Sequence, residues 1–188
     1  MSKVVPKVVK KPFVALRPVP VVLVSCGHGE QANIITIAWT GILCSSPPQV
    51  GIGVRQDRHS HGLIQEAGEF VVNVPGEGLL DEVEYCGFVS GREVDKFAVQ
   101  GLTPAPGSEV QTPIIAECPL NIECRLAHKL SLGSHDLFVG QVVAVQVSQE
   151  VLDERGRLDN DKLQPILFTG DEYWGLGSLL GRYGFKQK

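Results

Sequence analysis

The chain has 188 residues, of which 43% are hydrophobic and 20% charged, a balance that predicts a buried core and excludes a disordered chain. No apolar run approaches the roughly 18 residues that a membrane-spanning helix needs, so an integral membrane protein is not expected. The formal net charge is −4, but residues 1–20 carry five basic and no acidic residues. The remainder, with 12 basic and 21 acidic residues, carries −9, so general nucleic-acid binding is not expected.

We expect a single domain over residues 1–188, because no internal repeat or linker-like change of composition divides the chain. Residues 1–12 are predicted to be a basic, solvated leader, and the prolines in this region disfavour the alternative of a signal peptide. In chain order, apolar or alternating patterns predict strands at residues 19–25, 33–40, 50–55, 69–74, 120–126, 137–147 and 165–169.

Helical spacing predicts short helices at residues 59–67, from residue 79, at residues 93–99 and at residues 172–181. The strand at residues 137–147 is almost entirely apolar and is expected to be central in its sheet. The strands do not alternate regularly with helices, which disfavours a doubly wound sheet. About seven short strands with a few short helices predict a mainly β fold, a closed or half-closed β-barrel.

The five cysteines are odd in number and include no CxxC pair, so neither a disulfide framework nor a zinc site is expected. Free cysteines suit a reducing, cytoplasmic setting. His59 and His61 form an isolated HxH, which is more typical of a polar loop than of a metal site. A complete GxGxxG fingerprint after a strand, a P-loop, HExxH and GxSxG are all absent. The sequence therefore predicts no metal site and gives no local support for a Rossmann fold or a hydrolase.

Small and hydroxyl side chains share one face of the strand predicted at residues 33–40. Thr36, Ala38 and Thr40 are two residues apart and therefore point to the same side. One interpretation is a sheet face with its threonines in solvent. The other is a surface where a flat ring can approach the backbone.

A second polar group lies where the strand at residues 50–55 ends and the next helix begins. Arg55, Arg58 and His59 precede or open that helix, and Ser60 is a candidate cap. Arginines beside a helix start favour an anion site, with a solvated turn as the alternative. Lys96 could supply a further positive charge, although an isolated lysine is more often at the surface.

The run from Asn33 to Thr40, NIITIAWT, followed by CSSPP from Cys44, resembles the flavin reductase-like family that includes flavoredoxin. Further loose motifs follow in the order of that family: RHS at residues 58–60, GEFVVN at 68–73, SGR at 90–92, DKF at 95–97, and GSHD at 133–136. Each motif alone is weak, but their ordered series covers nearly the whole chain.

The resemblance implies an FMN-binding split β-barrel that forms a homodimer with the flavin near the subunit interface. Carried over by position, the residues that line the ring and the ribityl chain are Asn33, Thr36, Ala38, Trp39 and Thr40, with Cys44, Ser45 and Ser46 under the ring. The residues expected at the phosphate are Arg58, His59, Ser60 and Lys96, with Arg55 a less certain member. His135 falls near the flavin and the nicotinamide, but Ser134 stands where the family commonly has Asp, which leaves its orientation open.

Two functional classes follow from this resemblance. The first is an NAD(P)H-dependent flavin reductase in which FMN is a substrate or a bound cofactor. The second is an FMN-containing electron carrier that is reduced by a redox protein partner. A flavin-binding module without turnover is a weaker third alternative. In the first two classes the flavin supplies the redox chemistry and the chain supplies binding and geometry, so no strong acid or base is needed.

Overall fold

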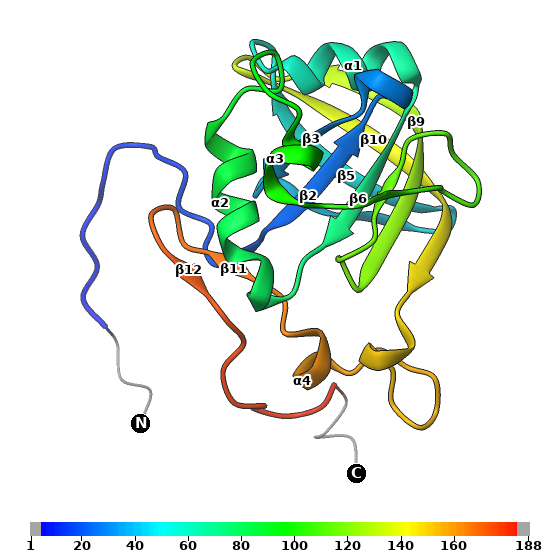
Figure 1. Cartoon of the computed structure of the whole chain (residues 1–188). Helices are drawn as coiled ribbons and strands as arrows, with labels where there is room; N and C mark the ends of the chain where they lie inside the picture. The colour runs from blue at the N-terminus through cyan, green and yellow to red at the C-terminus, as the bar shows by residue number, and fades with distance from the viewer. Residues whose placement is uncertain (1–4, 184–188) are drawn as a thin grey trace.

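The computed structural model describes residues 5–183, and its main element is a curled antiparallel sheet of seven strands (Figure 1). The strand order is β3-β2-β6-β9-β10-β5-β4. The bounds of these strands are β2 Val22–Cys26, β3 Asn33–Ile37, β4 Thr40–Ser45, β5 Pro48–Arg55, β6 Glu69–Val74, β9 Leu120–Ser131 and β10 His135–Val147. The mainly β fold predicted from the sequence is confirmed, and β10 is an inner strand as expected.

The two edge strands of the sheet are consecutive in the chain, which is why the sheet must curl. β3 lies at one edge and β4 at the other, and only Ala38 and Trp39 connect them. The backbone N–H of Gly53 on β5 donates to the carbonyl of Trp39 at 2.7 Å, which ties this connection to the far side of the sheet. The single strand predicted at residues 33–40 is therefore wrong: the chain bends at Ala38, and Thr36 and Thr40 belong to different strands.

The core inside the curled sheet is built from alternating residues of its strands. Val24, Ile35, Ile52, Phe70 and Phe138 are among its buried members. Burying each such side chain contributes roughly 1.5–3 kcal/mol. A second apolar cluster, which includes Leu23, Ile34, Val83 and Phe97, fills the space between the sheet and the helices.

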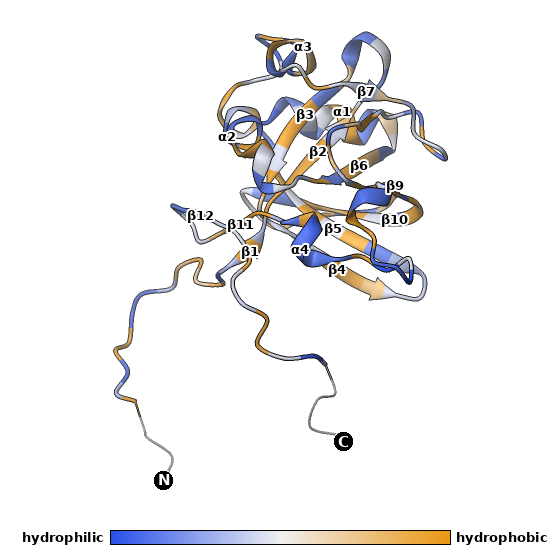
Figure 2. Ribbon diagram, turned by 60° about the horizontal axis from the view of Figure 1, so that its bottom comes forward, coloured by the Kyte–Doolittle hydropathy of each residue, from blue (hydrophilic) through white to orange (hydrophobic). Residues whose placement is uncertain are grey.

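Figure 2 shows that the apolar colouring continues along β4 at the sheet edge. There, Ile42 and Leu43 are exposed rather than buried.

In the described part of the chain, four short helices accompany the sheet: α1 His59–Ala67, α2 Leu80–Phe88, α3 Lys96–Gln100 and α4 Asn160–Leu163. The 3-10 turns are η1 Gly29–Gln31, η2 Glu77–Leu79 and η3 Gln149–Val151. The prediction for residues 59–67 is confirmed. However, the N-cap residue is Arg58, and Ser60 lies inside the helix without capping it. α3 begins three residues later than expected because the Asp95 carboxylate caps it by accepting from Ala98 N–H at 3.2 Å.

Small strands complete the fold. β1 Val19–Pro20, β11 Leu167–Phe168 and β12 Tyr173–Trp174 form one sheet, and β7 Pro104–Ala105 pairs with β8 Ile114–Ile115. The strand predicted at residues 19–25 thus divides between two sheets at Val21. The helix predicted at residues 172–181 is wrong, because β12 pairs with β11 and no helix follows it as far as residue 183.

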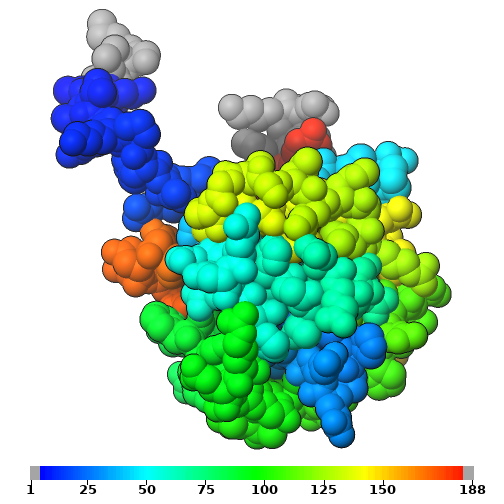
Figure 3. All heavy atoms as spheres, turned by 90° about the horizontal axis from the view of Figure 1, so that it is seen from above, coloured from blue at the N-terminus to red at the C-terminus, as the bar shows by residue number. Residues whose placement is uncertain are grey.

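Residues 5–12 of the predicted leader extend away from the body, as Figure 3 shows for the N-terminal end. The first four residues of that prediction lie outside the described part of the chain. Within residues 5–183, every helix is too short or too polar to cross a membrane.

Candidate functional site

Three adjoining cavities follow β3 and the bend that leads to β4. The polar cavity, of about 90 Å³, lies between β3, the turn that follows β5, the start of α1, the C-terminal end of α2 and the start of α3. The middle cavity, of about 220 Å³, adjoins it and shares Ile35, Arg58 and Gly87 with it. The apolar cavity, of about 440 Å³, shares Trp39 and His135 with the middle one. The three cavities therefore form a row that changes from polar to apolar.

Asn33 and Ser60 form the buried floor of the polar cavity. Asn33 Nδ2 donates to Ser60 Oγ at 2.8 Å, which joins the start of β3 to the first turn of α1. Gly91 packs against the other side of the Asn33 amide, and a Cβ at position 91 would collide with Asn33 Oδ1. This close approach requires glycine at position 91 and fixes the Asn33 side chain.

Lys96 places a buried ammonium group beside the same cavity. The residue is only 3% exposed, and its Nζ donates to the carbonyls of Ile34 and Cys86, both at 2.8 Å. An ammonium group has three donors, so one N–H remains for a ligand. Burial lowers the pKa of Lys96 from its usual value. Lys96 thus joins β3 to the C-terminal end of α2 and also lines the polar cavity.

The rest of the polar cavity is also rich in positive charge. Arg58 lines it at the N-cap of α1, and its side chain has no hydrogen-bond partner among the described residues. Burial, with Arg92 and Lys96 nearby, lowers the pKa of His59. Asp57 is the acidic exception, and it is neutralised by Arg55, whose Nε and NH2 donate to it at 3.2 and 2.8 Å. A helix N-terminus with cations around it is suited to bind an anion such as a phosphate.

The middle cavity is larger, and apart from Arg55 and Arg58 its lining is mainly apolar and aromatic. Thr36 lines it, but its hydroxyl donates to the Val83 carbonyl at 2.5 Å, so its proton is already used. Gly87 of α2 lies over Thr36, where a Cβ would approach Thr36 Cβ at 3.4 Å. On the opposite side, Tyr173 donates through its hydroxyl to Glu84 Oε2 at 2.6 Å and holds β12 against α2. Burial and the Glu84 carboxylate raise the pKa of Tyr173.

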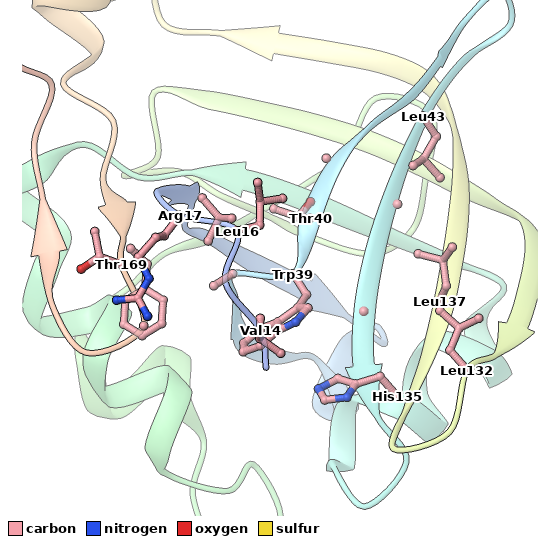
Figure 4. Close-up of a pocket in the computed structure, with 17 residues that line it drawn as sticks. Val14, Leu16, Arg17, Trp39, Thr40, Leu43, Leu132, His135, Leu137 and Thr169 are labelled. Atoms are coloured by element: carbon pink, nitrogen blue, oxygen red, sulfur yellow. The ribbon is translucent and has the colours of Figure 1, made fainter. Parts of the chain in front are cut away.

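Trp39 and His135 form the partition between the middle and apolar cavities. Their rings are stacked, with centroids 5.6 Å apart and an interplanar angle of 26°. In Figure 4 the His135 ring points toward Trp39. Ser134 Oγ lies 2.9 Å from His135 Nδ1, so serine occupies the hydrogen-bonding place beside this histidine. Because Nδ1 has this neighbour, Nε2 is the ring nitrogen left for a ligand.

A buried carboxylate aligns α1 with the strand that carries His135. Asp136 accepts from Gln56 Nε2 at 2.8 Å and lies 2.9 Å from His61 Nε2 and 3.3 Å from Lys129 Nζ. These hydrogen bonds lower the pKa of Asp136, and the bond from Gln56 has the largest effect. The contact with His61, a member of the HxH pair, holds α1 against β10 and so sets the polar cavity relative to His135.

Most of the predicted site residues come together in this row. The polar cavity is lined by Asn33, Arg58, His59, Ser60 and Lys96, and the middle cavity by Thr36, Ala38, Trp39, Arg55, Arg58 and His135. Thr40 lines only the apolar cavity. Cys44, Ser45 and Ser46 line none of the three, because β4 leaves the bend at Thr40 and runs along β5 to the hairpin at Pro48.

Several lining residues were not predicted. Gly87, Phe168 and Tyr173 come from α2 and the C-terminal strands, and no local pattern marks them as site residues. Gly91 belongs to the SGR motif, whose position in the ordered series was the only signal for it. Within residues 5–183, no three His, Cys, Asp or Glu side chains are grouped closely enough to hold a metal ion.

Comparison with known proteins identifies the family of this chain. Residues 15–177 match the model of the flavin reductase like domain. Flavoredoxin of Desulfovibrio vulgaris (Miyazaki F) is 32% identical with a TM-score of 0.90, and the match covers 97% of this chain and all of that one. The FMN-binding protein of Thermus thermophilus, solved with bound 1-cyclohex-2-enone, is 29% identical with a TM-score of 0.77 and coverage of 93% and 96%.

An uncharacterised protein of Archaeoglobus fulgidus is 39% identical over 116 residues, which are 62% of this chain and 66% of that protein. The fold, the family match and the similarity to flavoredoxin agree with one another, and the seven-stranded half-barrel is the split barrel that the sequence resemblance implied. The chain therefore belongs to the flavin reductase-like family, a family of FMN-binding oxidoreductases with the split-barrel fold.

Proposed function

We propose that this chain binds FMN, with the phosphate in the polar cavity and the flat ring in the middle cavity. The observation that carries the proposal is the row itself, in which a small cationic cavity adjoins a larger one that is lined mostly by apolar and aromatic residues, with Arg55 and Arg58 at the side of the polar cavity. A phosphate group needs several strong donors, and a fused ring needs a smooth apolar surface. The two cavities supply these in the order in which FMN carries them.

The polar cavity offers donors of the right kind. The guanidinium group of Arg58 has no hydrogen-bond partner among the described residues. Lys96 donates two hydrogen bonds to backbone carbonyls and has one N–H left. The backbone N–H groups of His59 and Ser60, in the first turn of α1, add further donors. Arg58 and Lys96 would bind the phosphate, Asn33 would hold Ser60 in place, and His59 would add charge when protonated.

The middle cavity suits a ring because its lining combines aromatic side chains with small residues. Ala38 and Gly53 contribute small or absent side chains, and Thr36 is held down by its bond to α2. Trp39 and His135 would border the ring on the side of the apolar cavity. The proposed contacts of Cys44, Ser45 and Ser46 with the flavin, and the homodimer that the family resemblance implies, remain predictions.

Bound FMN supplies the redox chemistry, because its ring can take up a hydride or electrons and release them. The chain's own residues position the reactants and exclude water. His135 would orient a nicotinamide ring through Nε2, while Ser134 steadies the histidine at Nδ1. On this proposal the protein is an NAD(P)H-dependent FMN reductase that acts in the cytoplasm.

The similarity to flavoredoxin favours a second candidate function. The chain would then be an electron carrier that holds FMN tightly and is reduced by a redox protein partner rather than by NAD(P)H. Both functions use the same flavin contacts, so FMN binding alone does not distinguish them.

An anaerobic stopped-flow experiment separates the two functions. Purified protein loaded with FMN is mixed with NADH, and separately with NADPH. The absorbance at about 450 nm is followed, because oxidised flavin absorbs there and reduced flavin does not. Rapid bleaching supports the reductase, and the faster donor gives the nicotinamide preference. A protein that binds FMN but stays oxidised with both donors supports the electron carrier. Failure to bind FMN contradicts both.

A further inference from the structure

A single arginine spans the polar cavity from one border to the other. One border is the turn after β5, and the other is the segment at residues 89–95, which connects α2 to α3. Arg92 Nη1 donates to the backbone carbonyl of Asp57 at 3.2 Å, although the two residues are 35 positions apart in the chain. Asp57 lines the cavity, and so do Ser90 and Gly91, the two residues before Arg92. This hydrogen bond therefore joins the two borders.

The segment that carries Arg92 is held at its base by packing and at its tip by this bond. At the base, Gly91 lies against the Asn33 amide, and the Asp95 carboxylate caps α3 directly after the segment. At the tip, Arg92 is exposed, and its side chain has no other hydrogen-bond partner in the described part of the chain. A tip that is held by one exposed hydrogen bond can open and close again while a ligand enters.

The charge of Arg92 also reaches the interior of the cavity. After burial, Arg92 is the next cause of the lowered pKa of His59, ahead of Lys96, and His59 lines the cavity. A guanidinium group has five N–H donors, and Arg92 uses one of them on Asp57. The same side chain can thus join the two borders and keep donors for an anion inside.

The space behind Arg92 is small. The polar cavity holds about 90 Å³, the volume that about three water molecules occupy in the liquid, at about 30 Å³ each. Small-molecule sites usually offer about 300–1,000 Å³. One phosphate group fits this space, whereas a second phosphate with an adenosine does not. Because the middle cavity is the proposed place of the ring, a dinucleotide would have to leave the polar cavity between the two borders that Arg92 joins.

We propose that Arg92 is a specificity-determining residue of the flavin site: its bond to the Asp57 carbonyl closes the polar cavity behind a terminal phosphate, so that the site prefers FMN to the dinucleotide FAD. The bond opens when FMN enters or leaves and closes once the phosphate is bound. FAD continues beyond this phosphate and keeps the bond open. The inference rests on the proposed function, because it takes the polar cavity as the phosphate site.

The first experiment compares three flavins on the wild-type protein. The purified full chain, freed of flavin, is titrated with FMN, FAD and riboflavin while flavin fluorescence is followed. We expect the Kd for FAD to be at least about tenfold higher than that for FMN, because one hydrogen bond from a charged donor is lost. Riboflavin, which lacks the phosphate, gives the affinity of the ring and the ribityl chain alone. Equal Kd values for FMN and FAD would overturn the inference.

A variant without the spanning side chain tests the residue. In Arg92→Ala the cavity stays open for both ligands, so the Kd values for FMN and FAD should lie within about threefold of each other. Arg125→Ala is the matched control, because Arg125 is also exposed and also donates to a backbone carbonyl, that of Glu109 at 2.7 Å, but it lines none of the three cavities. The control should keep the wild-type preference, and thermal unfolding checks that both variants fold. A tenfold preference for FMN that persists in folded Arg92→Ala would overturn the assignment.

Binding rates distinguish a closing residue from a simple electrostatic contact. If Arg92 only attracted the phosphate, Arg92→Ala would slow the association of FMN and speed its dissociation. A bond that must open limits both steps, so in stopped-flow measurements the association and dissociation rates of the variant should each rise by at least about threefold. Slower association would leave Arg92 as an electrostatic contact and overturn the proposed closure.

The wild-type titration separates a failure of this inference from a failure of the proposed function. A protein that binds FMN and FAD with equal affinity keeps the proposed function and loses only the role of Arg92. A protein that does not bind FMN contradicts the proposed function, and the inference fails with it.

Discussion

The polar and apolar cavities stand at the two ends of one row, and they differ in both size and charge. The polar cavity holds about 90 Å³ beside Arg58, His59 and Lys96, whereas the apolar cavity holds about 440 Å³ and has only a half-exposed arginine as a charge. Charge-assisted hydrogen bonds are available in the first cavity, whereas the lining of the second offers mainly apolar contact. The rings of Trp39, His135 and Phe168 line both the middle and the apolar cavity, so aromatic side chains mark the boundary at which the polar character of the row ends.

The largest expected effect comes from removing the buried cation of the polar cavity. Lys96→Ala leaves the carbonyls of Ile34 and Cys86 without a donor, and each buried, unpaired group costs about 1–3 kcal/mol. We therefore expect a lower melting temperature together with a loss of FMN affinity of more than about tenfold. Lys162→Ala is the matched control, because Lys162 also donates to a carbonyl, that of Leu152 at 2.7 Å, but from an exposed position. An FMN affinity equal to that of the control would remove Lys96 from the site.

Arg58→Ala should act on binding without acting on the fold. The residue is exposed, and its side chain bonds to nothing else among the described residues, so the melting temperature should not change. Loss of a charged hydrogen bond to the phosphate should weaken FMN by about 10- to 100-fold, measured by fluorescence titration. Riboflavin, which lacks the phosphate, should bind the variant and the wild type alike. The exposed Arg155→Ala is the control, and a weakening for riboflavin equal to that for FMN would contradict a phosphate contact.

His135 tests the partition between the cavities. Its ring stacks on Trp39 and is proposed to orient the nicotinamide, so His135→Ala should slow single-turnover hydride transfer by about tenfold. The FMN affinity of the variant should change by a smaller factor. His135→Gln, which retains a donor, should recover part of the rate. A variant that transfers hydride at the wild-type rate would leave His135 with a structural role only.

The smallest expected effect is the pH dependence of the polar cavity. Burial and nearby cations lower the pKa of His59 in the free protein. A bound phosphate would raise this pKa again, so FMN binding should take up a proton. The affinity for FMN should therefore increase as the pH falls from about 8 to about 6.5. This window stays above the second pKa of the phosphate group, about 6, so the charge of the phosphate changes little. We expect a change of less than about tenfold by titration at several pH values. His59→Gln should abolish it, and riboflavin should not show it.

The sequence predicted those elements whose local pattern is strong. The helix at residues 59–67 and the strand at residues 69–74 lie where they were expected, because the chain there meets clear start and stop signals, including Gly68 in the left-handed conformation with φ 68°. The residues that open α1 form part of the polar cavity for the same reason: Arg58, His59 and Ser60 are neighbours in the chain, so a local motif is enough to bring them together.

The errors fall where pairing with another strand decides the structure. The bend at Ala38 and Trp39 breaks an apparently continuous strand because the two edges of the sheet must meet, and the Gly53 N–H on β5 holds the bend. The residues at 173–174 pair with β11 instead of forming a helix, since a strand edge is available there and glycines weaken the helix. For the bend, the partner strand β5 lies beyond the β4 hairpin, so no local pattern marks it. β11 and β12 are neighbours in the chain, but the edge that β11 offers is held in place by β1, at the other end of the sequence.

The sequence alone determined the mainly β character, the family and several residues of the polar cavity, because alternation along strands and short motifs are properties of neighbouring residues. Only the tertiary structure decided which cavity each residue lines. It moved Cys44, Ser45 and Ser46 away from the row, brought Phe168 and Tyr173 into it, and enclosed the apolar cavity with four segments far apart in the chain. Cavities form between elements, and the curl that brings the edges of a sheet together is set by packing across the whole chain.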